Sequence, residues 1–246
     1  MSLDRNDPSG NATPREHALM ALPSPRARVT LHWCRLDLPR EETDRLATLL
    51  SPGERARMER FGSPLLRDRY TVGRASLRLL LASRAGMAPD RIAIGCDAMQ
   101  RPHLRSSAGI DFNVSHTGGT AVFAIAENAR VGVDIEPEQR QIRTSDILRK
   151  FMSANERAPF ASLDVDQARA RVLRLWTCKE ALSKATGDAL AAPFSRLTVA
   201  LEPMPRLIAG PAPYCPRDFA LFALEAPPGF VASLAIWERP DSPVSV

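Results

Sequence analysis

The sequence predicts an α+β fold, in which strands and helices follow one another without a regular strand–helix–strand order. Three observations support this. Residues 110–137 alternate apolar and polar side chains in short runs separated by tight turns, which is typical of strands. Residues 63–83 and 166–184 instead carry apolar side chains at helical spacing. Both sides of residue 130 are mixed in this way, and no internal sequence repeat is readable.

Length and composition are those of a globular protein. The 246 residues can bury a substantial core, and 44% hydrophobic with 25% charged residues is ordinary for such a chain. No stretch approaches the ~18–20 apolar residues of a membrane span, so no membrane partner is expected. Residues 1–27 contain no apolar core of signal-peptide type and are expected to form a disordered extension. The four cysteines are widely spaced, which predicts a cytoplasmic protein with reduced thiols.

The charge balance favours acidic partners. A net charge of +5 suits phosphates, nucleic acid or an acidic protein surface. The low aromatic content of 6% counts against stacking on single-stranded nucleic acid, and no nucleic-acid partner is expected. Only three of the 33 basic residues are lysines, and two of them, Lys179 and Lys184, fall within six residues. This clustering indicates a need for a compact point charge there.

The first half of the chain, expected over residues 28–129, opens with a strand over 29–36, in which Val29, Leu31 and Trp33 share a face. A short amphipathic helix follows over 41–50, and Ser51-Pro52-Gly53-Glu54 is a capping box for a helix to 61. The remaining predicted elements are a helix over 63–83 that begins at Ser63-Pro64, a short strand over 92–94, a loop over 99–104, and strands over 110–115 and 120–126. Short turns join the last strands to the next one, which predicts an antiparallel meander.

The second half, expected over residues 130–240, begins with the strand Val131–Ile135. Pro137 lacks a backbone donor and ends it. The remaining predicted elements are a helix over 145–151, a helix capped by Ser153 and Glu156, a long helix over 166–184 closed by Gly187, a strand over 197–201, and a hairpin of 219–224 with 230–237. Residues 240–246 are expected to be frayed.

Two acidic residues of the 131–135 strand and its end point to a metal. Asp134 and Glu136 lie two residues apart, so they face the same side of the strand with Cα atoms roughly 6.5 Å apart. Such close carboxylates repel unless a cation lies between them, and Mg²⁺ prefers oxygen ligands. The alternative is a strand end with two solvated acidic side chains.

The long helix carries a matching stripe. Trp176, Glu180 and Lys184 are spaced four residues apart and share one face. They could form an ordinary ion pair worth roughly 0.2–0.5 kcal/mol beside a core aromatic. In the functional interpretation, Glu180 is a third oxygen ligand and Lys184 contacts the phosphates that the metal binds, which makes a magnesium–pyrophosphate site.

The turn over residues 113–119 offers a hydroxyl, an imidazole and two glycines to an anion. Ser115 and His116 are adjacent on a strand and point to opposite faces, so they suit phosphate contacts better than a nucleophile–base pair.

Three blocks of the sequence carry a resemblance to a known family. They are Phe112–Gly118 (FNVSHTG), Gly132–Glu136 (GVDIE) and Trp176–Lys184 (WTCKEALSK). In this order and at this spacing they resemble the signature blocks of the 4′-phosphopantetheinyl transferases. The likeness is greatest to the larger monomeric type that activates peptide and polyketide synthetases, and it extends more thinly over residues 51–201.

The resemblance implies a pseudo-dimer of two similar α+β halves, each with a small antiparallel sheet packed against helices, with coenzyme A in the cleft between them. Mg²⁺ would bridge the pyrophosphate while a serine of an acyl or peptidyl carrier protein attacks the β-phosphate, releasing adenosine 3′,5′-bisphosphate. The matching positions imply Asp134, Glu136 and Glu180 as metal ligands, Asp134, Glu180 and Lys184 as catalytic residues, and Arg57, Arg69, Arg101, Ser115, His116 and Lys184 as coenzyme contacts.

Some positions depart from the family pattern or stay open. Glu54 stands where a basic residue is frequent, and the capping box explains it structurally. Gln100 replaces the glycine that usually precedes the basic-Pro pair Arg101-Pro102. Glu156 fits a helix cap as well as a catalytic group. Glu180 is expected to be a metal ligand first, and the base that deprotonates the serine is left open. The alternative function is a non-catalytic module of the same fold that binds the coenzyme or carrier protein.

Overall fold

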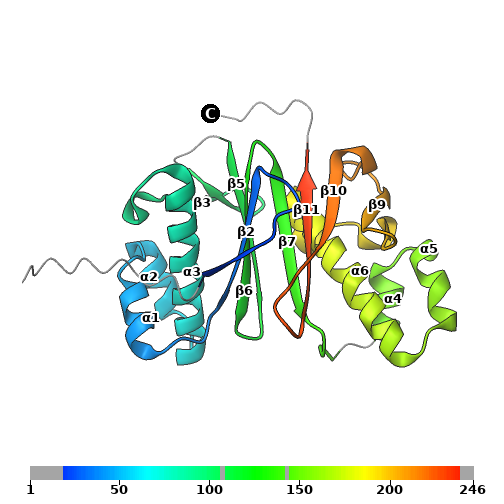
Figure 1. Ribbon diagram of the computed structural model, residues 1–246, viewed down its shortest axis with the longest axis horizontal. Coiled ribbons are helices and arrows are strands. Elements are labelled where there is room, and N and C mark those ends of the chain that lie inside the picture. Colours follow the sequence, from blue (N-terminus) through cyan, green and yellow to red (C-terminus); the bar gives the residue numbers. More distant parts are fainter. Residues whose placement is uncertain (1–18, 106–108, 142–143, 239–246) are drawn as a thin grey trace, which may run out of the picture.

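The computed structural model describes residues 19–105, 109–141 and 144–238 (Figure 1). Its strands are β1 (Leu19–Leu22), β2 (Val29–Arg35), β3 (Ile94–Cys96), β4 (Pro102–Leu104), β5 (Ile110–Thr117), β6 (Thr120–Glu127), β7 (Arg130–Pro137), β8 (Thr198–Ala200), β9 (Arg206–Ala209), β10 (Phe219–Leu224) and β11 (Phe230–Trp237). The α-helices are α1 (Arg40–Ala47), α2 (Pro52–Glu59), α3 (Pro64–Ala85), α4 (Thr144–Phe151), α5 (Ala154–Arg157) and α6 (Val165–Thr186). Short 3₁₀ turns lie at Pro89–Arg91, Ala158–Ser162, Ala189–Ala191, Phe194–Arg196 and Pro216–Asp218.

The chain forms two halves, each with an antiparallel sheet covered by helices. The first sheet has the order β1-β2-β6-β5, and the second has the order β10-β11-β7. Figure 1 shows helices α1 to α3 on the outer side of the first sheet and α6 with α4 on the outer side of the second. This arrangement confirms the α+β prediction and its two sheet-and-helix halves.

Three hydrophobic clusters hold these layers together. Val72, Leu81 and Phe123 are part of the cluster between α3 and the first sheet. A second cluster joins the two sheets and includes Val122 of β6, Val133 of β7 and Leu234 of β11. The third lies under α6 and contains Leu175, Leu182 and Trp237. Because β6 and β7 each face a helix layer on one side and the other sheet on the opposite side, both are buried along most of their length.

The edges of the two sheets meet at β5 and β7, and side chains join them. Alternate residues of β5 accept hydrogen bonds from alternate backbone N–H groups of β7. The acceptors are Asp111 for Val131 at 2.8 Å, Asn113 for Val133 at 2.9 Å and Ser115 for Ile135 at 3.4 Å. These bonds satisfy an otherwise unpaired strand edge. They also set the register of β7 against β5.

Most predicted elements are confirmed, including the capping box of Ser51 and Glu54 with Pro52 at the first helical position. The 3.6-residue and two-residue periods both reflect one-sided burial, which a local pattern can reveal. The predicted hairpin of 219–224 with 230–237 is also present as β10 and β11.

Four predictions are wrong in detail. Residues 19–22, expected to be disordered, form the edge strand β1 against Leu31–Cys34. The predicted loop over 99–104 contains β4, which pairs with β3. The strand expected over 92–94 is β3, which begins only at Ile94. Strand β9 was not predicted. The meander does not continue beyond β6, because β7 pairs with β11, almost a hundred residues later in the chain. Backbone partners so distant leave no local signal. The expectations for residues 1–18 and 239–246 lie outside the described residues.

Candidate active site

The acidic residues of β7 lie in a pocket at the carboxyl end of that strand. The pocket has a volume of about 480 Å³, and Asp134 and Glu136 line it together. Glu180 and Lys184 of α6 line the same pocket, as do Ser115 and His116 of β5. Six residues singled out in the sequence thus come together from two sheets and one helix. The remaining lining residues are Thr117, Ile135, Pro137, Arg140 and Trp176.

Gly132 explains how α6 comes so close to β7. A Cβ atom at this position would lie 2.5 Å from the backbone nitrogen of Ala185 and closer still to the carbonyl oxygen of Ala181. Only a glycine leaves room for the helix backbone there. Glu180 and Lys184, each one residue before these alanines, therefore lie beside Asp134. A glycine inside an alternating strand was the sequence signal for this contact.

Lys184 is held in place by three hydrogen bonds. Its Nζ donates to Asp134 Oδ1 at 2.6 Å, to Ser115 Oγ at 2.9 Å and to the carbonyl of Val133 at 3.1 Å. Ser115 Oγ donates in turn to Asp134 Oδ1 at 2.9 Å. The Ser115 hydroxyl also accepts the Ile135 N–H, so its bonding capacity is used within the protein. Ser115 thus positions Lys184 and Asp134.

The carboxylates of the pocket differ in their surroundings. Asp134 is 5% exposed, and its Oδ2 has no hydrogen-bond partner among the described residues. Glu136 forms an ion pair with Arg140. Glu180 is 9% exposed and has no ion-pair partner within the described part of the chain. Burial, and then the charge of Asp134, raise the pKa of Glu180, while Lys184 and Arg140 oppose that shift.

A divalent cation fits this set of donors. In the present side-chain arrangement, no three His, Cys, Asp or Glu residues among those described stand at metal-binding distances. In this arrangement Lys184 pairs with Asp134 Oδ1 and Arg140 pairs with Glu136, while Asp134 Oδ2 stays open to a cation. Three all-oxygen ligands and a buried oxygen without a partner suit a hard ion such as Mg²⁺.

A second pocket, of about 500 Å³, adjoins the first and shares His116 and Thr117 with it. Arg57, Arg69 and Arg74 line it on one side. Its apolar and aromatic lining residues are Leu36, Phe61, Leu66, Tyr70, Leu77, Pro102, Phe112, Val114 and Ala121. An apolar slot with guanidinium groups at its rim suits a flat, anionic ligand.

Contacts around the second pocket orient its arginines. Arg69 makes a two-pronged ion pair with Asp37, at 2.6 and 2.8 Å, which lowers the pKa of that carboxyl. Arg57 and Arg74 lie over the ring of Tyr70, at 5.9 and 5.8 Å from its centroid. The two helices that face β5 thus supply the positive charge of this pocket.

Glu54 has a structural role in the same region. Its carboxylate caps α2 through the backbone N–H of Ser51, at 2.8 Å, and binds buried Arg78 at 3.1 Å. The acidic residue at this position thus joins α2 to α3.

His116 lies at the rim between the two pockets. Unlike buried Ser115, its side chain is exposed, as the alternation of β5 predicted. Partial desolvation by the surrounding protein, and then the charge of Lys184, lower the pKa of His116. The imidazole is therefore neutral near pH 7 and can donate one hydrogen bond.

Arg101 does not line either pocket. Its guanidinium is 7% exposed and makes a bidentate ion pair with Asp111, both bonds at 2.6 Å. It also donates to the carbonyls of Val131 at 2.9 Å and Lys184 at 3.0 Å. These contacts tie β4, β5, β7 and α6 together, and its neighbour Pro102 lines the second pocket instead. Gln100 has φ of 62°, which explains why glycine suits that position.

The two clustered lysines have different roles. Lys179 is fully buried, and its Nζ lies 2.6 Å from Glu156 Oε2 and 2.7–2.8 Å from the carbonyls of Phe151, Phe194 and Leu197. Burial lowers the pKa of Lys179, and the charge of Glu156 opposes this. Glu156 caps α5 and accepts the Val199 N–H. The network is structural, and Lys184 alone of this pair reaches the pocket.

Sequence reasoning missed two residues of the site. Gly132 was named only as the first residue of the block Gly132–Glu136, with no role assigned to it. Arg140 was not singled out, because it follows the strand in a turn in which its N–H donates to the carbonyl of Pro137 at 3.0 Å. A basic residue six positions after Asp134 gave no distinctive signal among 33 basic residues.

Comparisons with known proteins find consistent matches. A family model described as the 4′-phosphopantetheinyl transferase superfamily matches residues 130–220, and one described as the N-terminal region of 4′-phosphopantetheinyl transferase matches residues 38–128. The chain is 33% identical to the 4′-phosphopantetheinyl transferase HetI of Nostoc sp. over 68% of its own length and 72% of that protein.

It is also 28% identical to a 4′-phosphopantetheinyl transferase of Bacillus subtilis, over 65% of the chain and 70% of that relative. Among solved structures, a holo-(acyl-carrier-protein) synthase from Bacillus anthracis in complex with CoA (3′,5′-ADP) aligns with a TM-score of 0.37 at 20% identity, covering 45% of this chain and 96% of that one. None of the helices in the described ranges is long and apolar enough to cross a membrane.

Proposed function

The chain belongs to the 4′-phosphopantetheinyl transferase superfamily, and from this premise we propose that its two adjoining pockets bind coenzyme A and a divalent cation. The enzyme transfers the 4′-phosphopantetheine group of coenzyme A to a serine of an acyl or peptidyl carrier protein. The two halves are proposed to divide between residues 129 and 130, and the first half begins before residue 28 because β1 belongs to its sheet.

The reaction exchanges the phosphoanhydride link of coenzyme A for a phosphodiester link to the serine. The serine oxygen of the carrier protein forms a bond to the β-phosphorus of coenzyme A. The bond between this phosphorus and the bridging oxygen breaks, and adenosine 3′,5′-bisphosphate leaves with that electron pair. The serine proton passes to a base. Such transfers depend on positioning and on neutralisation of charge more than on covalent participation of the protein.

The arginine-lined pocket is proposed to hold the nucleotide part of the coenzyme. Its apolar lining suits an adenine ring, while Arg57 and Arg69 are placed to bind the 3′-phosphate. His116, at the rim shared with the first pocket, is proposed to donate to the diphosphate. Arg101 and Ser115, implied as coenzyme contacts by the resemblance, instead support the site through contacts within the protein.

Asp134, Glu136 and Glu180 are proposed to hold Mg²⁺. A bound Mg²⁺ would neutralise negative charge on the diphosphate and its leaving group. Lys184 holds Asp134 and Ser115 at the back of the pocket. Glu180 is proposed as a ligand, since its side chain lines the pocket with Lys184 and Arg140 and forms an ion pair with neither within the described residues.

One observation supports this proposal above the others. Three acidic side chains from a strand and a distant helix line one pocket, and that pocket adjoins an apolar slot rimmed with arginines. A non-catalytic coenzyme-binding module would gain nothing from carboxylates that repel the diphosphate. Like the larger monomeric type that its sequence resembles, the protein is proposed to act as a monomer, and the free thiols of its cysteines support a cytoplasmic location.

The direct test is incubation with coenzyme A, Mg²⁺ and a panel of apo-carrier proteins, followed by intact-protein mass spectrometry. We expect a gain of one phosphopantetheine group on at least one carrier, abolished by chelation of the metal. Asp134→Ala and Glu180→Ala should each reduce the rate at least a hundredfold, whereas Glu138→Ala, an exposed acidic residue beyond Pro137, should leave it unchanged. Full activity of both pocket variants would refute the site. Coenzyme binding without transfer to any carrier would favour the non-catalytic module.

A further inference from the structure

The two cations of the carboxylate pocket are not equivalent. Lys184 and Arg140 both line it and each pairs with one acidic residue, Asp134 and Glu136 respectively. The Lys184 side chain is 24% exposed, and the Arg140 side chain is 41% exposed. Their remaining hydrogen-bonding capacity decides which of them can bind a phosphate group.

Lys184 has no donor left for a ligand in this arrangement. An ammonium group carries three N–H donors, and those of Lys184 are directed to Asp134, Ser115 and the carbonyl of Val133. To bind a phosphate, it would have to release a buried carboxylate or a buried carbonyl, and such groups are costly to leave unpaired. Lys184 therefore acts as a fixed positive charge that positions Asp134.

Arg140 has donors to spare. A guanidinium carries five N–H donors, and among the described residues the side chain of Arg140 contacts one hydrogen-bond acceptor, the carboxylate of Glu136. Its guanidinium carbon lies 5.9 Å from the centre of the Trp176 ring, which supports the group without using its N–H edges. The planar fork that remains matches two oxygens of a phosphate.

The ion pair that holds Arg140 is also easy to exchange. Arg140 is four residues from Glu136 in the turn after β7, and solvent reaches the pair from the arginine side, where the side chain is 41% exposed, although Glu136 is 13% exposed. A divalent cation shared by the carboxylates competes directly with Arg140 for Glu136, because both need the same oxygens. The competition leaves the guanidinium free at the mouth of the pocket, next to the bound diphosphate.

We infer that Arg140 is a substrate-binding residue, which passes from Glu136 to the diphosphate of coenzyme A when a divalent cation occupies the carboxylates. This inference rests on the proposed function and adds Arg140 to the phosphate contacts of this pocket, with Lys184 positioning Asp134. Metal and coenzyme then bind cooperatively, since the metal releases a cation that the coenzyme needs.

The test is isothermal titration of the purified protein with coenzyme A and with inorganic pyrophosphate, each with and without Mg²⁺. In Mg²⁺, Arg140→Ala should weaken binding of both ligands about tenfold, the loss expected for a charge-assisted hydrogen bond. Arg140→Lys should fall between, because it keeps the charge and loses the fork. Without Mg²⁺ the difference between wild type and Arg140→Ala should shrink, as Glu136 then holds the arginine. Mg²⁺ alone should bind Arg140→Ala at least as tightly as wild type.

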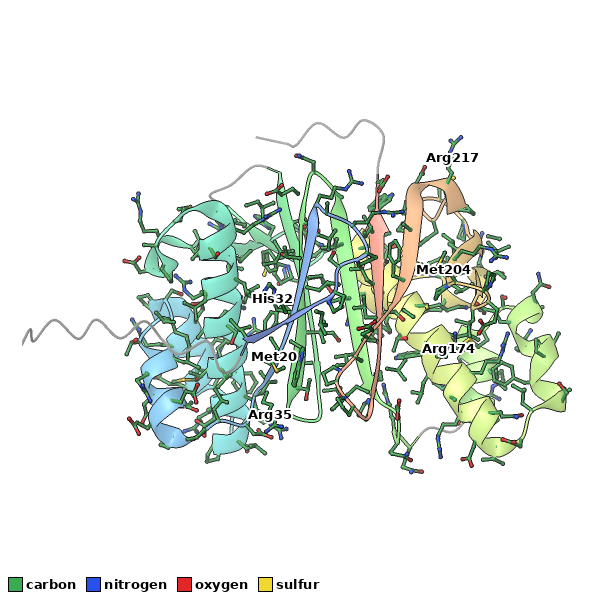
Figure 2. All side chains as sticks on the ribbon, viewed as in Figure 1. Met20, His32, Arg35, Arg174, Met204 and Arg217 are labelled. Carbon is green, nitrogen blue, oxygen red and sulfur yellow. The ribbon has the colours of Figure 1, made fainter. Side chains whose placement is uncertain are left out.

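Arg217→Ala is the matched control. The Arg217 side chain is 87% exposed. Arg217 lies just before β10, at the end of the second sheet where β7 begins, whereas Arg140 lies beyond the end of β7. Figure 2 places Arg217 at the far edge of the molecule, pointing into solvent. This variant should bind both ligands as wild type does. Melting temperatures of the three variants should agree within about 2 °C, since the exposed side chains contribute little to folding.

Equal affinity of wild type and Arg140→Ala in Mg²⁺ would overturn the inference, as would an equal loss in the Arg217→Ala control. The result is separable from the proposed function. A wild-type protein that binds pyrophosphate through Arg140 but modifies no carrier would refute the function alone. A wild-type protein that modifies carriers while Arg140→Ala binds and reacts unchanged would refute this inference alone.

Discussion

Replacing Gly132 by alanine should separate α6 from β7 and uncouple the two parts of the site. The added Cβ would lie 2.5 Å from Ala185 N and closer to Ala181 O, whereas Cβ contacts under 3.0 Å essentially never occur. Both neighbours are helix backbone and cannot rotate away. The helix must therefore retreat by about 1 Å, with an overpacking cost of about 1–3 kcal/mol.

The displacement has a defined effect on the chemistry. Glu180 and Lys184 move with the helix, while Asp134 and Glu136 stay with β7, so the three carboxylates no longer converge. A misplacement of about 1 Å can reduce a rate about a hundredfold. The arginine-lined pocket is built from α2, α3 and β5 and does not contain α6, so its hold on the coenzyme should persist.

The assay is steady-state transfer to an apo-carrier, with melting curves of the same samples. We expect Gly132→Ala to lower kcat about a hundredfold, to change the KM for coenzyme A much less, and to lower the Tm by roughly 3–10 °C. Gly53→Ala is the control, since a Cβ there has nothing within 4 Å and the residue lies in α2. That variant should be fully active and as stable as wild type or slightly more so. Activity of Gly132→Ala within twofold of wild type would refute the account of the helix–strand contact.

Two further predictions concern buried charges. Lys179→Met should lower stability by about 3–5 kcal/mol, because it leaves the charge of Glu156 buried in the core without its cation. Lys150→Met, at an exposed lysine of α4, should not lower it, and equal melting temperatures of the two variants would contradict the structural role of the Lys179 network. Glu180→Gln should raise the Tm in metal-free buffer at neutral pH, because the folded state raises the pKa of this carboxyl above 4.5 and so disfavours its ionised form. The gain should be absent well below pH 4.5, where the acid is protonated in both states, should grow between pH 4.5 and the raised pKa of the folded state, and should be constant above it. A gain independent of pH over this range would disprove this origin.

How far the fold could be predicted depended on whether the signal was local. The alternation around Asp134 and the capping box of Ser51 and Glu54 are local, and both are confirmed. The pairing of β7 with β11 is not, because the strands are separated by α4, α5, α6 and the three strands β8, β9 and β10. The exposed edge of an antiparallel sheet can pair with any strand whose apolar residues face the same side. Which strand pairs with β7 therefore depends on how the whole second half packs.

The same distinction applies to the site. Asp134 with Glu136, and Glu180 with Lys184, could be paired from the strand and helix periods, since each period fixes which side chains share a face. That the two pairs meet in one pocket was a hypothesis supported by the family resemblance. The role of Arg101 could not, because its partner Asp111 lies on another strand and nothing in the sequence indicates that this guanidinium is buried. A surface arginine and a buried bridging arginine have the same sequence signature.

Two independent constraints place α6, and they explain why the site residues are on this helix. Gly132, with Ala181 and Ala185, sets how closely the helix approaches β7. Lys179 sets its rotation, because its ammonium group is fixed by carbonyls and Glu156 on the side of the helix away from β7. At about 100° per residue, Glu180 and Lys184 are then within about 40° of each other and turned well away from Lys179. A strand glycine and a buried lysine, neither of which touches the pocket, thereby determine where its carboxylate and ammonium groups meet Asp134.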